Sequence, residues 1–283
     1  MSETAALTAK AGRAHGPETS AARARRWGAF YFAEQVLRVM KGYAFSILMY
    51  SVGQPVAYLF AMGVGLATLV DAEGAAAFGG VSYLAFIAPA LLVSAAVMTA
   101  ANEFTFPVMG GFKWRRTYYG PHASPLTPEQ IAAGHIIAVT VRLLVQSAIY
   151  FVAVALFGAS PGGWGWVGIL VATAAGLSFG LPLMAYSASI TEDKGQFALV
   201  MRFIVMPFFL FSGTFFPLDS LPLAVRWIGW ISPIWHGTEL GRVFSYGYQE
   251  PLLLTVVHIV VLLALAVVGW KLTKRQFVKR MGQ

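Results

Sequence analysis

Residues 252–270 read LLLTVVHIVVLLALAVVGW, and the chain continues to residue 283 as KLTKRQFVKRMGQ. The first stretch carries no charge and has the length, roughly 20 apolar residues, that a helix needs to cross a bilayer. The second stretch places five lysines and arginines directly after it. Because Lys and Arg gather on the cytoplasmic side of membrane helices, this pair predicts a membrane span followed by a cytoplasmic segment.

Five more apolar stretches lie upstream, and together they predict an all-α integral membrane protein with six transmembrane helices. The predicted spans cover residues 43–70, 81–101, 131–157, 164–190, 197–216 and 252–270. The fifth is the least regular, because Arg202 and Pro207 interrupt it.

The composition agrees with a membrane protein and excludes several other classes. Of 283 residues, 58% are hydrophobic and 11% are charged, whereas soluble domains average about 25% charged residues. This argues against a soluble enzyme and against a nucleic-acid binder, despite the net charge of +8. The chain has no cysteine, which excludes disulfides, thiol catalysis and Cys-based zinc sites. His122, His135 and His236 have no metal-ligand spacing, so we expect no metal site and no catalytic residue.

The distribution of basic residues predicts the orientation. With the amino terminus inside, 16 of the 20 lysines and arginines fall in cytoplasmic segments. Arg226 and Arg242 fall outside, and Arg142 and Arg202 lie within spans. This asymmetry predicts a multi-pass protein of the bacterial cytoplasmic membrane, with both termini in the cytoplasm.

The segments flanking the spans differ in character. Residues 1–26 are predicted to be a flexible cytoplasmic tail, and residues 276–283 a basic cytoplasmic tail. Over residues 27–42, the charged Glu34, Arg38 and Lys41 share one face of a helical wheel and apolar side chains share the opposite face. This pattern predicts an amphipathic helix lying on the cytoplasmic membrane surface. A juxtamembrane extension of the first span is the alternative. Residues 43–275 then form the six-span domain.

The cytoplasmic loop of residues 102–130 is unlike a simple connector. It combines large aromatic residues with three basic ones: Phe104, Phe106, Phe112, Lys113, Trp114, Arg115, Arg116, Tyr118 and Tyr119. Such a mixture is typical of a protein–protein contact. A loop whose basic residues touch anionic lipid headgroups is the alternative. Thr127 and Gln130 have the spacing of a capping box, which predicts the start of the third span's helix.

The outer segment of residues 217–250 is too apolar for disorder and too long for a hairpin loop. Asp219 or Ser220 can cap a short helix with Pro222 in its first turn, and a second helix is predicted over about residues 234–244. The tryptophans Trp227, Trp230 and Trp235 favour membrane-interface depth. We therefore predict two short re-entrant helices dipping into the outer leaflet, with a surface cap as the alternative.

Two motifs carry a family resemblance. Ser124–Ile131, reading SPLTPEQI, is similar to the stretch after the second span in permeases of type-2 ATP-binding-cassette exporters. Residues 211–222, reading FSGTFFPLDSLP, resemble that family's SG-x-FFP-x-x-x-LP signature. Ser232-Pro233 follows, with His236, Glu239 and Arg242 downstream. The resemblance extends over about residues 27–275, and the most similar subgroup is that of nodulation-factor and daunorubicin exporters.

The resemblance implies an assembly of two permeases and two copies of a nucleotide-binding ATPase. The second permease is a copy of this chain or a related chain. The chain contains no G-x-x-x-x-G-K-[ST] motif, so ATP and Mg are expected in the partner ATPase. The loop between the second and third spans would be the ATPase-coupling loop, with Phe106, Pro107, Phe112, Lys113, Trp114, Arg115, Arg116 and Tyr118. The outer re-entrant helices would close the exit, with Asp219, Trp227, Trp230, Trp235, His236 and Glu239.

Charged and aromatic residues within the spans give two further hypotheses. A charge deep in a span should face protein or a water-filled cavity. We therefore predict an intramembrane ion pair between Glu103 and Arg142. Beyond the helix-breaking Pro207, aromatic residues form a substrate path or gate, or equally a lipid-facing wall: Phe208, Phe211, Phe215 and Phe216.

The sequence therefore favours a transport subunit over an enzyme. The subgroup resemblance favours an amphipathic substrate, a lipid-linked saccharide or glycolipid, and leaves a hydrophobic drug-like metabolite as the alternative. An ion-coupled transporter is less favoured, because no carboxylate lies deep in a span. A membrane-embedded transferase is less favoured, because the acidic residues are scattered.

Overall fold

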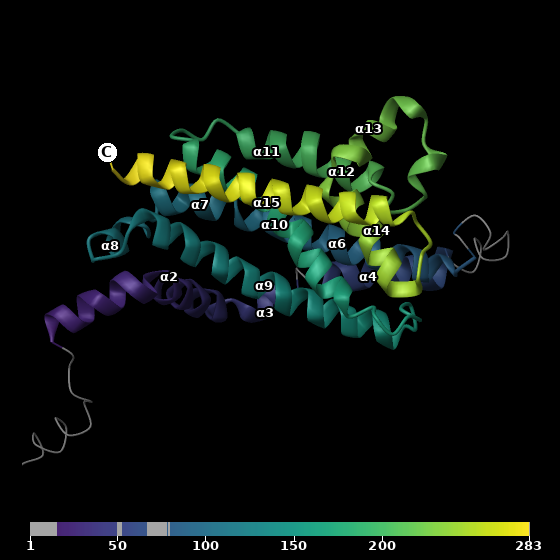
Figure 1. Ribbon diagram of the computed structural model, residues 1–283, viewed down its shortest axis with the longest axis horizontal. Coiled ribbons are helices and arrows are strands. Elements are labelled where there is room, and N and C mark those ends of the chain that lie inside the picture. The colour runs from purple at the N-terminus through teal and green to yellow at the C-terminus, as the bar shows by residue number, and fades with distance from the viewer. Residues whose placement is uncertain (1–15, 50–52, 67–77, 79, 283) are drawn as a thin grey trace, which may run out of the picture.

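The computed structural model describes residues 16–49, 53–66, 78 and 80–282, and every regular element in these ranges is a helix. Figure 1 shows the long helices running side by side along the longest axis. In chain order the elements are α2 (Pro17–Gly42), α3 (Ala44–Leu48), α4 (Gln54–Phe60), η2 (Ala61–Leu66), α6 (Tyr83–Glu103), α7 (Phe106–Phe112), α8 (Tyr119–His122), α9 (Pro128–Leu156), α10 (Val167–Ser189), α11 (Gln196–Val200), η4 (Met201–Val205), α12 (Met206–Phe211), η5 (Leu218–Ser220), α13 (Leu223–Ile231), α14 (Pro233–Tyr246) and α15 (Leu252–Met281).

Four helices in the described part of the chain are long and apolar enough to cross a membrane. They are Tyr83–Phe112, Pro128–Leu156, Val167–Ser189 and Leu252–Met281. These overlap the predicted spans at residues 81–101, 131–157, 164–190 and 252–270. The sequence therefore located these four helices correctly. Two of these helices are longer than predicted at the end that carries basic residues. The helix that starts with α6 continues through α7 to Phe112, and α15 continues to Met281.

The other two predicted spans are not among the long apolar helices found in the described residues. The span predicted over 43–70 contains α3, α4 and η2, and its residues 50–52 and 67–70 lie outside the described residues. The span predicted over 197–216 corresponds to a shorter apolar helix, Gln196–Phe211. At about 1.5 Å per residue this helix reaches roughly 24 Å, less than the ~30 Å of a bilayer core. Its π-helical part, η4, comes just before Pro207, which has no N–H to donate.

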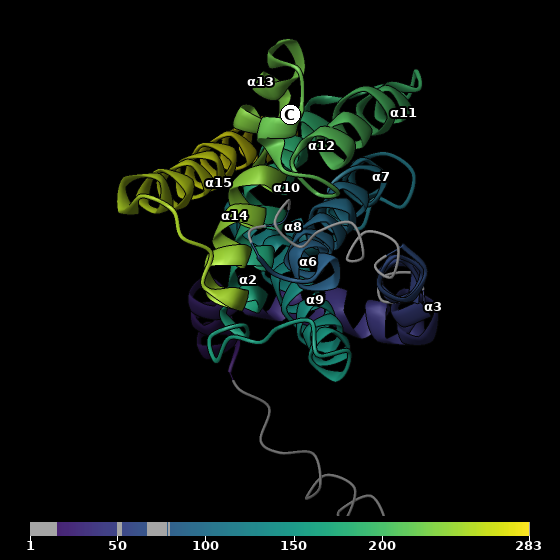
Figure 2. The same ribbon diagram turned by 90° about the vertical axis from the view of Figure 1, so that its right-hand side faces the viewer.

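Burial identifies α6 as the centre of the bundle. Inside the structure, 89% of the apolar window of α6 is buried, compared with 17% for α15. Figure 2 looks along the bundle and shows α6 and α10 near the middle, with α15 and α3 at the margin. The apolar surface of α15 is therefore left for lipid or another membrane chain to cover.

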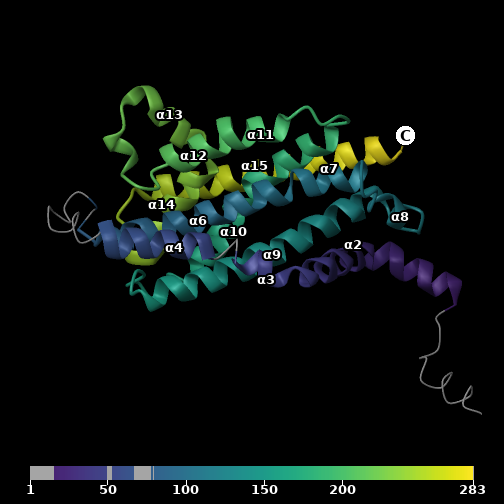
Figure 3. The same ribbon diagram turned by 180° about the vertical axis from the view of Figure 1, so that it is seen from behind.

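The two ends of the bundle carry different elements. Figures 1 and 3 show α7, α8 and the carboxyl terminus at one end, and α13 and α14 at the other. Helix α2 also begins at the end that carries α8. It starts at Pro17, so residues 17–26, for which we predicted a flexible tail, are helical. Ala and Arg favour helix and a proline fits the first helical turn, which accounts for this earlier start.

Helix α2 packs along α9 through its predicted apolar face. Phe32 and Ala33 are buried, whereas Glu34 and Arg38 are exposed and form an ion pair at 2.6 Å. The approach is close, because a Cβ added at Gly134 of α9 would lie 2.5 Å from the carbonyl oxygen of Ala29. The apolar stripe of α2 is thus turned toward protein.

Candidate functional site

The connection between α6 and α9 forms an ordered cap at one end of the bundle. It contains α7 and α8, and the third-span helix α9 then begins at Thr127. The Thr127 side chain accepts from the Gln130 backbone N–H, and the Gln130 side chain accepts from the Thr127 backbone N–H. The capping box predicted from the sequence is therefore confirmed.

Tyr118 is the centre of this cap. It is 2% exposed, and its ring centroid lies 4.8 Å from that of Phe112 and 5.2 Å from that of Phe277 in α15. Its hydroxyl lies 3.1 Å from Nδ1 of His135 in α9. Gly111 allows this arrangement, since a Cβ there would lie 2.4 Å from the Tyr118 ring. Burial raises the pKa of the Tyr118 phenol, which keeps the hydroxyl neutral.

The cap presents aromatic and basic side chains outward. Of the predicted coupling-loop residues, Phe112 and Tyr118 are buried in its base. The other six lie on its exposed side: Phe106, Pro107, Lys113, Trp114, Arg115 and Arg116. Trp114 is 54% exposed, and Nζ of Lys113 lies 5.8 Å from its ring centroid. Arg116 has a φ of 50°, a left-handed conformation that turns the chain sharply toward Tyr118.

Below the cap, Arg142 of α9 contacts Glu103 at the end of α6. The Arg142 guanidinium donates to the Glu103 carboxylate, and each side chain is only 14% exposed. The structure thus brings together the two residues that were predicted to pair. Their contact joins the helix that leads into the cap to the helix that leaves it.

At the opposite end, α13 and α14 form a helical pair. Trp227 and Trp230 are about half exposed on α13, and Asp219 lies at the surface in η5. His236 and Glu239 of α14 point inward and are almost fully buried. Trp235 packs on His258 of α15, with ring centroids 4.8 Å apart.

Two sets of hydrogen-bonded side chains connect α14 to neighbouring segments. His236 shares a hydrogen bond with His258 at 2.7 Å between their Nδ1 atoms. Arg242 donates to Glu239 at 2.7 Å and to the Gly213 carbonyl at 2.6 Å, and its guanidinium carbon lies 3.7 Å from the Phe86 ring centroid. Arg242 thereby holds the SG-x-FFP segment against α6 and α14.

The aromatic residues that follow Pro207 pack against different parts of the structure. The Phe208 ring lies 6.2 Å from Phe179 of α10, and the Phe215 ring lies 5.2 Å from Phe209. Tyr83 of α6 donates to the Phe215 carbonyl at 3.2 Å. Pro207, Phe211 and Phe216 are partly buried. Their role as a substrate path or gate remains a prediction.

Most of the chain matches a known protein family. The family model of the ABC-2 type transporter matches residues 28–246. The chain belongs to the ABC-2 type transporter family.

Similar proteins occur in nodulating bacteria. The permease is 29% identical to Nodulation protein J of Rhizobium leguminosarum bv. viciae over 224 residues, which cover 77% of this chain and 82% of that protein. It is 26% identical to Nodulation protein J of Rhizobium meliloti (strain 1021) over 246 residues, which cover 85% and 89% of the two chains. ABC-2 permeases lack an ATPase domain and pair with a separate nucleotide-binding ATPase, which binds the nucleotide. This chain is accordingly a multi-pass membrane permease and not an ATPase.

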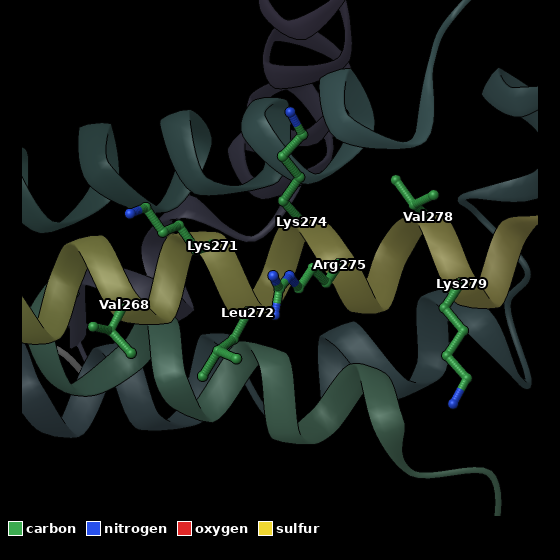
Figure 4. Close-up of a pocket in the computed structure, with 7 residues that line it drawn as sticks. All are labelled: Val268, Lys271, Leu272, Lys274, Arg275, Val278 and Lys279. Atoms are coloured by element: carbon green, nitrogen blue, oxygen red, sulfur yellow. The ribbon is translucent and has the colours of Figure 1, made fainter.

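The end of the permease that carries the cap has a second source of positive charge, in α15. Figure 4 shows Lys271, Lys274, Arg275 and Lys279 leaving different sides of this helix, with Lys274 and Lys279 pointing in opposite directions. Lys274 Nζ lies 3.9 Å from Glu129 at the start of α9. The basic tail predicted from the sequence is thus a continuation of the last helix.

Sequence reasoning missed two cap residues in α15. Phe277 completes the ring cluster around Tyr118, and the Arg280 guanidinium carbon lies 4.4 Å from the Phe112 ring centroid. Arg280 also donates to the carbonyls of Ala188 and Ile190. Phe277 is the single aromatic residue in the basic stretch 271–283, which is a weak indication that it has a packing partner.

Proposed function

We propose that this chain is the permease subunit of an ATP-driven exporter for an amphipathic substrate, with a lipid-linked saccharide or glycolipid favoured. The substrate leaves through or out of the bacterial cytoplasmic membrane. The family membership and the similarity to Nodulation protein J over most of both chains support this proposal. Transport direction and substrate class come from the resemblance to nodulation-factor exporters.

In this proposal, the cap between α6 and α9 is the coupling loop that docks on the ATPase. The observation that carries it is the division of the cap into a buried aromatic base and an exposed aromatic and basic face. A push on the exposed face is expected to reach the long helices, because Phe112 and Tyr118 pack on Phe277 of α15 and the Tyr118 hydroxyl contacts His135 of α9. The exposed Trp114 and Arg116 are residue types that anchor protein interfaces.

The transport cycle follows from these connections. Closure of the ATPase dimer pushes the cap, and the Glu103–Arg142 contact passes the motion to α6 and α9 together. Helices α13 and α14 act as the outer re-entrant pair that closes the exit. The permease then alternates between closed and open states whose populations ATP binding shifts.

The full assembly contains two ATPase copies and a second permease, either this chain again or a related one. Six spans and two cytoplasmic termini complete the proposed topology, with α2 packed against the first part of α9. The excess of basic residues around the cap and α15 supports placing this end in the cytoplasm.

The coupling loop is tested by Trp114→Ala and Arg116→Ala in the purified complex of the permease and its ATPase, reconstituted in lipid. We expect both variants to insert normally but to lower substrate-stimulated ATP hydrolysis by about tenfold, the effect of losing one interface anchor of ~1.4 kcal/mol. Trp164→Ala is the matched control, since Trp164 is 65% exposed in the loop between α9 and α10. Normal stimulation in both cap variants would refute the coupling role.

The substrate class is tested with the same complex. Glycolipid fractions are expected to stimulate ATP hydrolysis and to appear on the far side of the vesicle membrane in the presence of ATP. Stimulation by hydrophobic drug-like compounds, with no response to glycolipid, would replace the favoured substrate by the alternative one.

A further inference from the structure

A cavity of about 330 Å³ lies between α14, the start of α15 and the segment that joins them. Helix α14, which lines it, lies at the end of the bundle opposite the cap (Figure 1). Six of the residues that line it are aromatic: Phe78, Phe86, Trp230, Trp235, Tyr246 and Tyr248. Its polar lining includes Glu239, Arg242, Asp219 and Glu250. Ligand sites commonly combine such ring faces with a few fixed polar groups.

The carboxylates of the cavity already have partners. Glu239 accepts from Arg242 at 2.7 Å, and Asp219 lies 3.4 Å from Arg226. Glu250 accepts from the Thr255 hydroxyl at 2.6 Å and lies 3.4 Å from Nε2 of His258. The cavity therefore does not need a cationic ligand to balance an unpaired negative charge.

The cavity also offers a polar group that the described part of the protein leaves unused. Among the residues that the structure describes, the buried Tyr246 hydroxyl has no hydrogen-bond partner. A buried polar atom without a partner costs free energy, so a ligand or water that bonds to it is favoured. The guanidinium of Arg242 has five N–H groups, and three of them donate to groups in the described part of the chain.

We propose that this cavity binds a saccharide, the polar part of the exported amphiphile, at the outer end of the permease. This inference rests on the proposed export function. A sugar ring has an apolar C–H face that packs on aromatic rings and a rim of hydroxyls that both donate and accept. The cavity supplies both kinds of surface, whereas an apolar metabolite would leave Glu239, Arg242 and the Tyr246 hydroxyl without a partner in the ligand.

The decisive variant is Tyr246→Phe. Because the Tyr246 hydroxyl bonds to no described protein group, its removal should not lower the melting temperature of the ligand-free complex. If the hydroxyl bonds to sugar, the same change weakens saccharide binding. Tyr248→Ala removes a ring face that is already 39% exposed, so folding should tolerate it as well.

Binding is measured by titration calorimetry on the purified permease–ATPase complex with cellobiose, maltose and N,N′-diacetylchitobiose as probes. We expect at least one disaccharide to bind saturably, and Tyr246→Phe and Tyr248→Ala to weaken it by about fivefold to tenfold. Tyr31→Phe, at an exposed position of α2, is the matched control and should bind as the wild type.

The inference is overturned if no disaccharide binds, if both cavity variants bind as the wild type, or if tetramethylammonium binds in place of sugar. Glycolipid-stimulated ATP hydrolysis, measured on the same preparation, separates this inference from the export proposal. Stimulation without saccharide binding overturns the cavity assignment alone. Saccharide binding without glycolipid-stimulated ATP hydrolysis supports the assignment of the cavity and contradicts glycolipid as the exported substrate.

Discussion

The contact between Glu103 and Arg142 is the residue-scale feature that sequence reasoning located most directly. Arg142 lies within an otherwise apolar stretch, and Glu103 lies at the end of another apolar stretch far away in the chain. A charge in such a setting is stable only with a partner, and Glu103 lies at the end of α6, facing Arg142 of α9. The requirement that a charge in an apolar segment has a partner was therefore enough to predict this long-range contact from the sequence.

A variant that removes one charge of the Glu103–Arg142 pair should be less stable than a variant in which the two charges are exchanged. We expect Glu103→Gln or Arg142→Gln to lower stability by about 3–5 kcal/mol, because each breaks the ion pair between two mostly buried side chains. The exchanged double variant, Glu103→Arg with Arg142→Glu, should recover much of the loss. Thermal unfolding and transport in vesicles measure the two effects. Additive losses in the double variant would mean that the pair is not coupled.

Gly111 makes a second residue-scale prediction possible. Gly111→Ala adds a Cβ that would lie 2.4 Å from the Tyr118 ring, so Tyr118 must move and its contact with His135 is lost. We expect trypsin to cut faster after the exposed Lys113, Arg115 and Arg116. Gly120→Ala is the control, since a Cβ there meets nothing within 4 Å. Equal cleavage rates in both variants would contradict the role given to Tyr118.

At the scale of elements, the docking of α2 on α9 depends on close backbone approach. In Gly134→Ala the new Cβ would lie 2.5 Å from the Ala29 carbonyl oxygen, and backbone cannot yield as a flexible side chain does. We expect α2 to lift away from α9. Because the chain has no cysteine, Ala33→Cys provides a single probe at a position that is 3% exposed.

The readout is the rate of maleimide labelling at position 33. Labelling should be slow in the wild-type background and faster with Gly134→Ala. Gly42→Ala, where the added Cβ meets nothing within 4 Å, should leave the rate unchanged. Fast labelling in all three backgrounds would show that α2 is not held on α9.

Local patterns predicted some elements well. The capping box fixed the start of α9, and the second outer helix, predicted over residues 234–244, is α14 at Pro233–Tyr246. The first outer helix begins at Leu223, after Pro222, and not at Asp219 or Ser220, which form the short η5. These features depend on residues near one another in the chain, where capping and proline geometry decide the outcome.

Other contacts could not be predicted, because they join distant segments. The pairing of His236 with His258 and the packing of Phe277 on Tyr118 depend on how α14 and α15 pass their neighbours. Helix periodicity gives the face on which a residue lies but not the helix that it meets. No hydrophobic repeat indicates the two π-helical segments, η2 and η4.

At the scale of the whole molecule, burial is uneven across the apolar helices. Helix α6 is enclosed, whereas α15 exposes large apolar side chains along most of its length, among them Leu253, Val260 and Leu263. A single permease of this shape has to be covered on its α15 side by lipid tails or by another membrane chain. The apolar composition is thus divided between an internal core and an external surface.

The orientation of the molecule is the last prediction, and the absence of cysteine makes it simple to test. Thr117→Cys in the cap and Lys279→Cys in α15 probe the basic end, whereas Gly163→Cys and Ser220→Cys probe the opposite end. All four positions are exposed. With 16 of 20 basic residues on the predicted inner side, a membrane-impermeant maleimide should label positions 163 and 220 in intact cells. Positions 117 and 279 should react only after the membrane is opened. Labelling of 117 and 279 in intact cells would reverse the orientation, and would place the cap out of reach of any cytoplasmic ATPase.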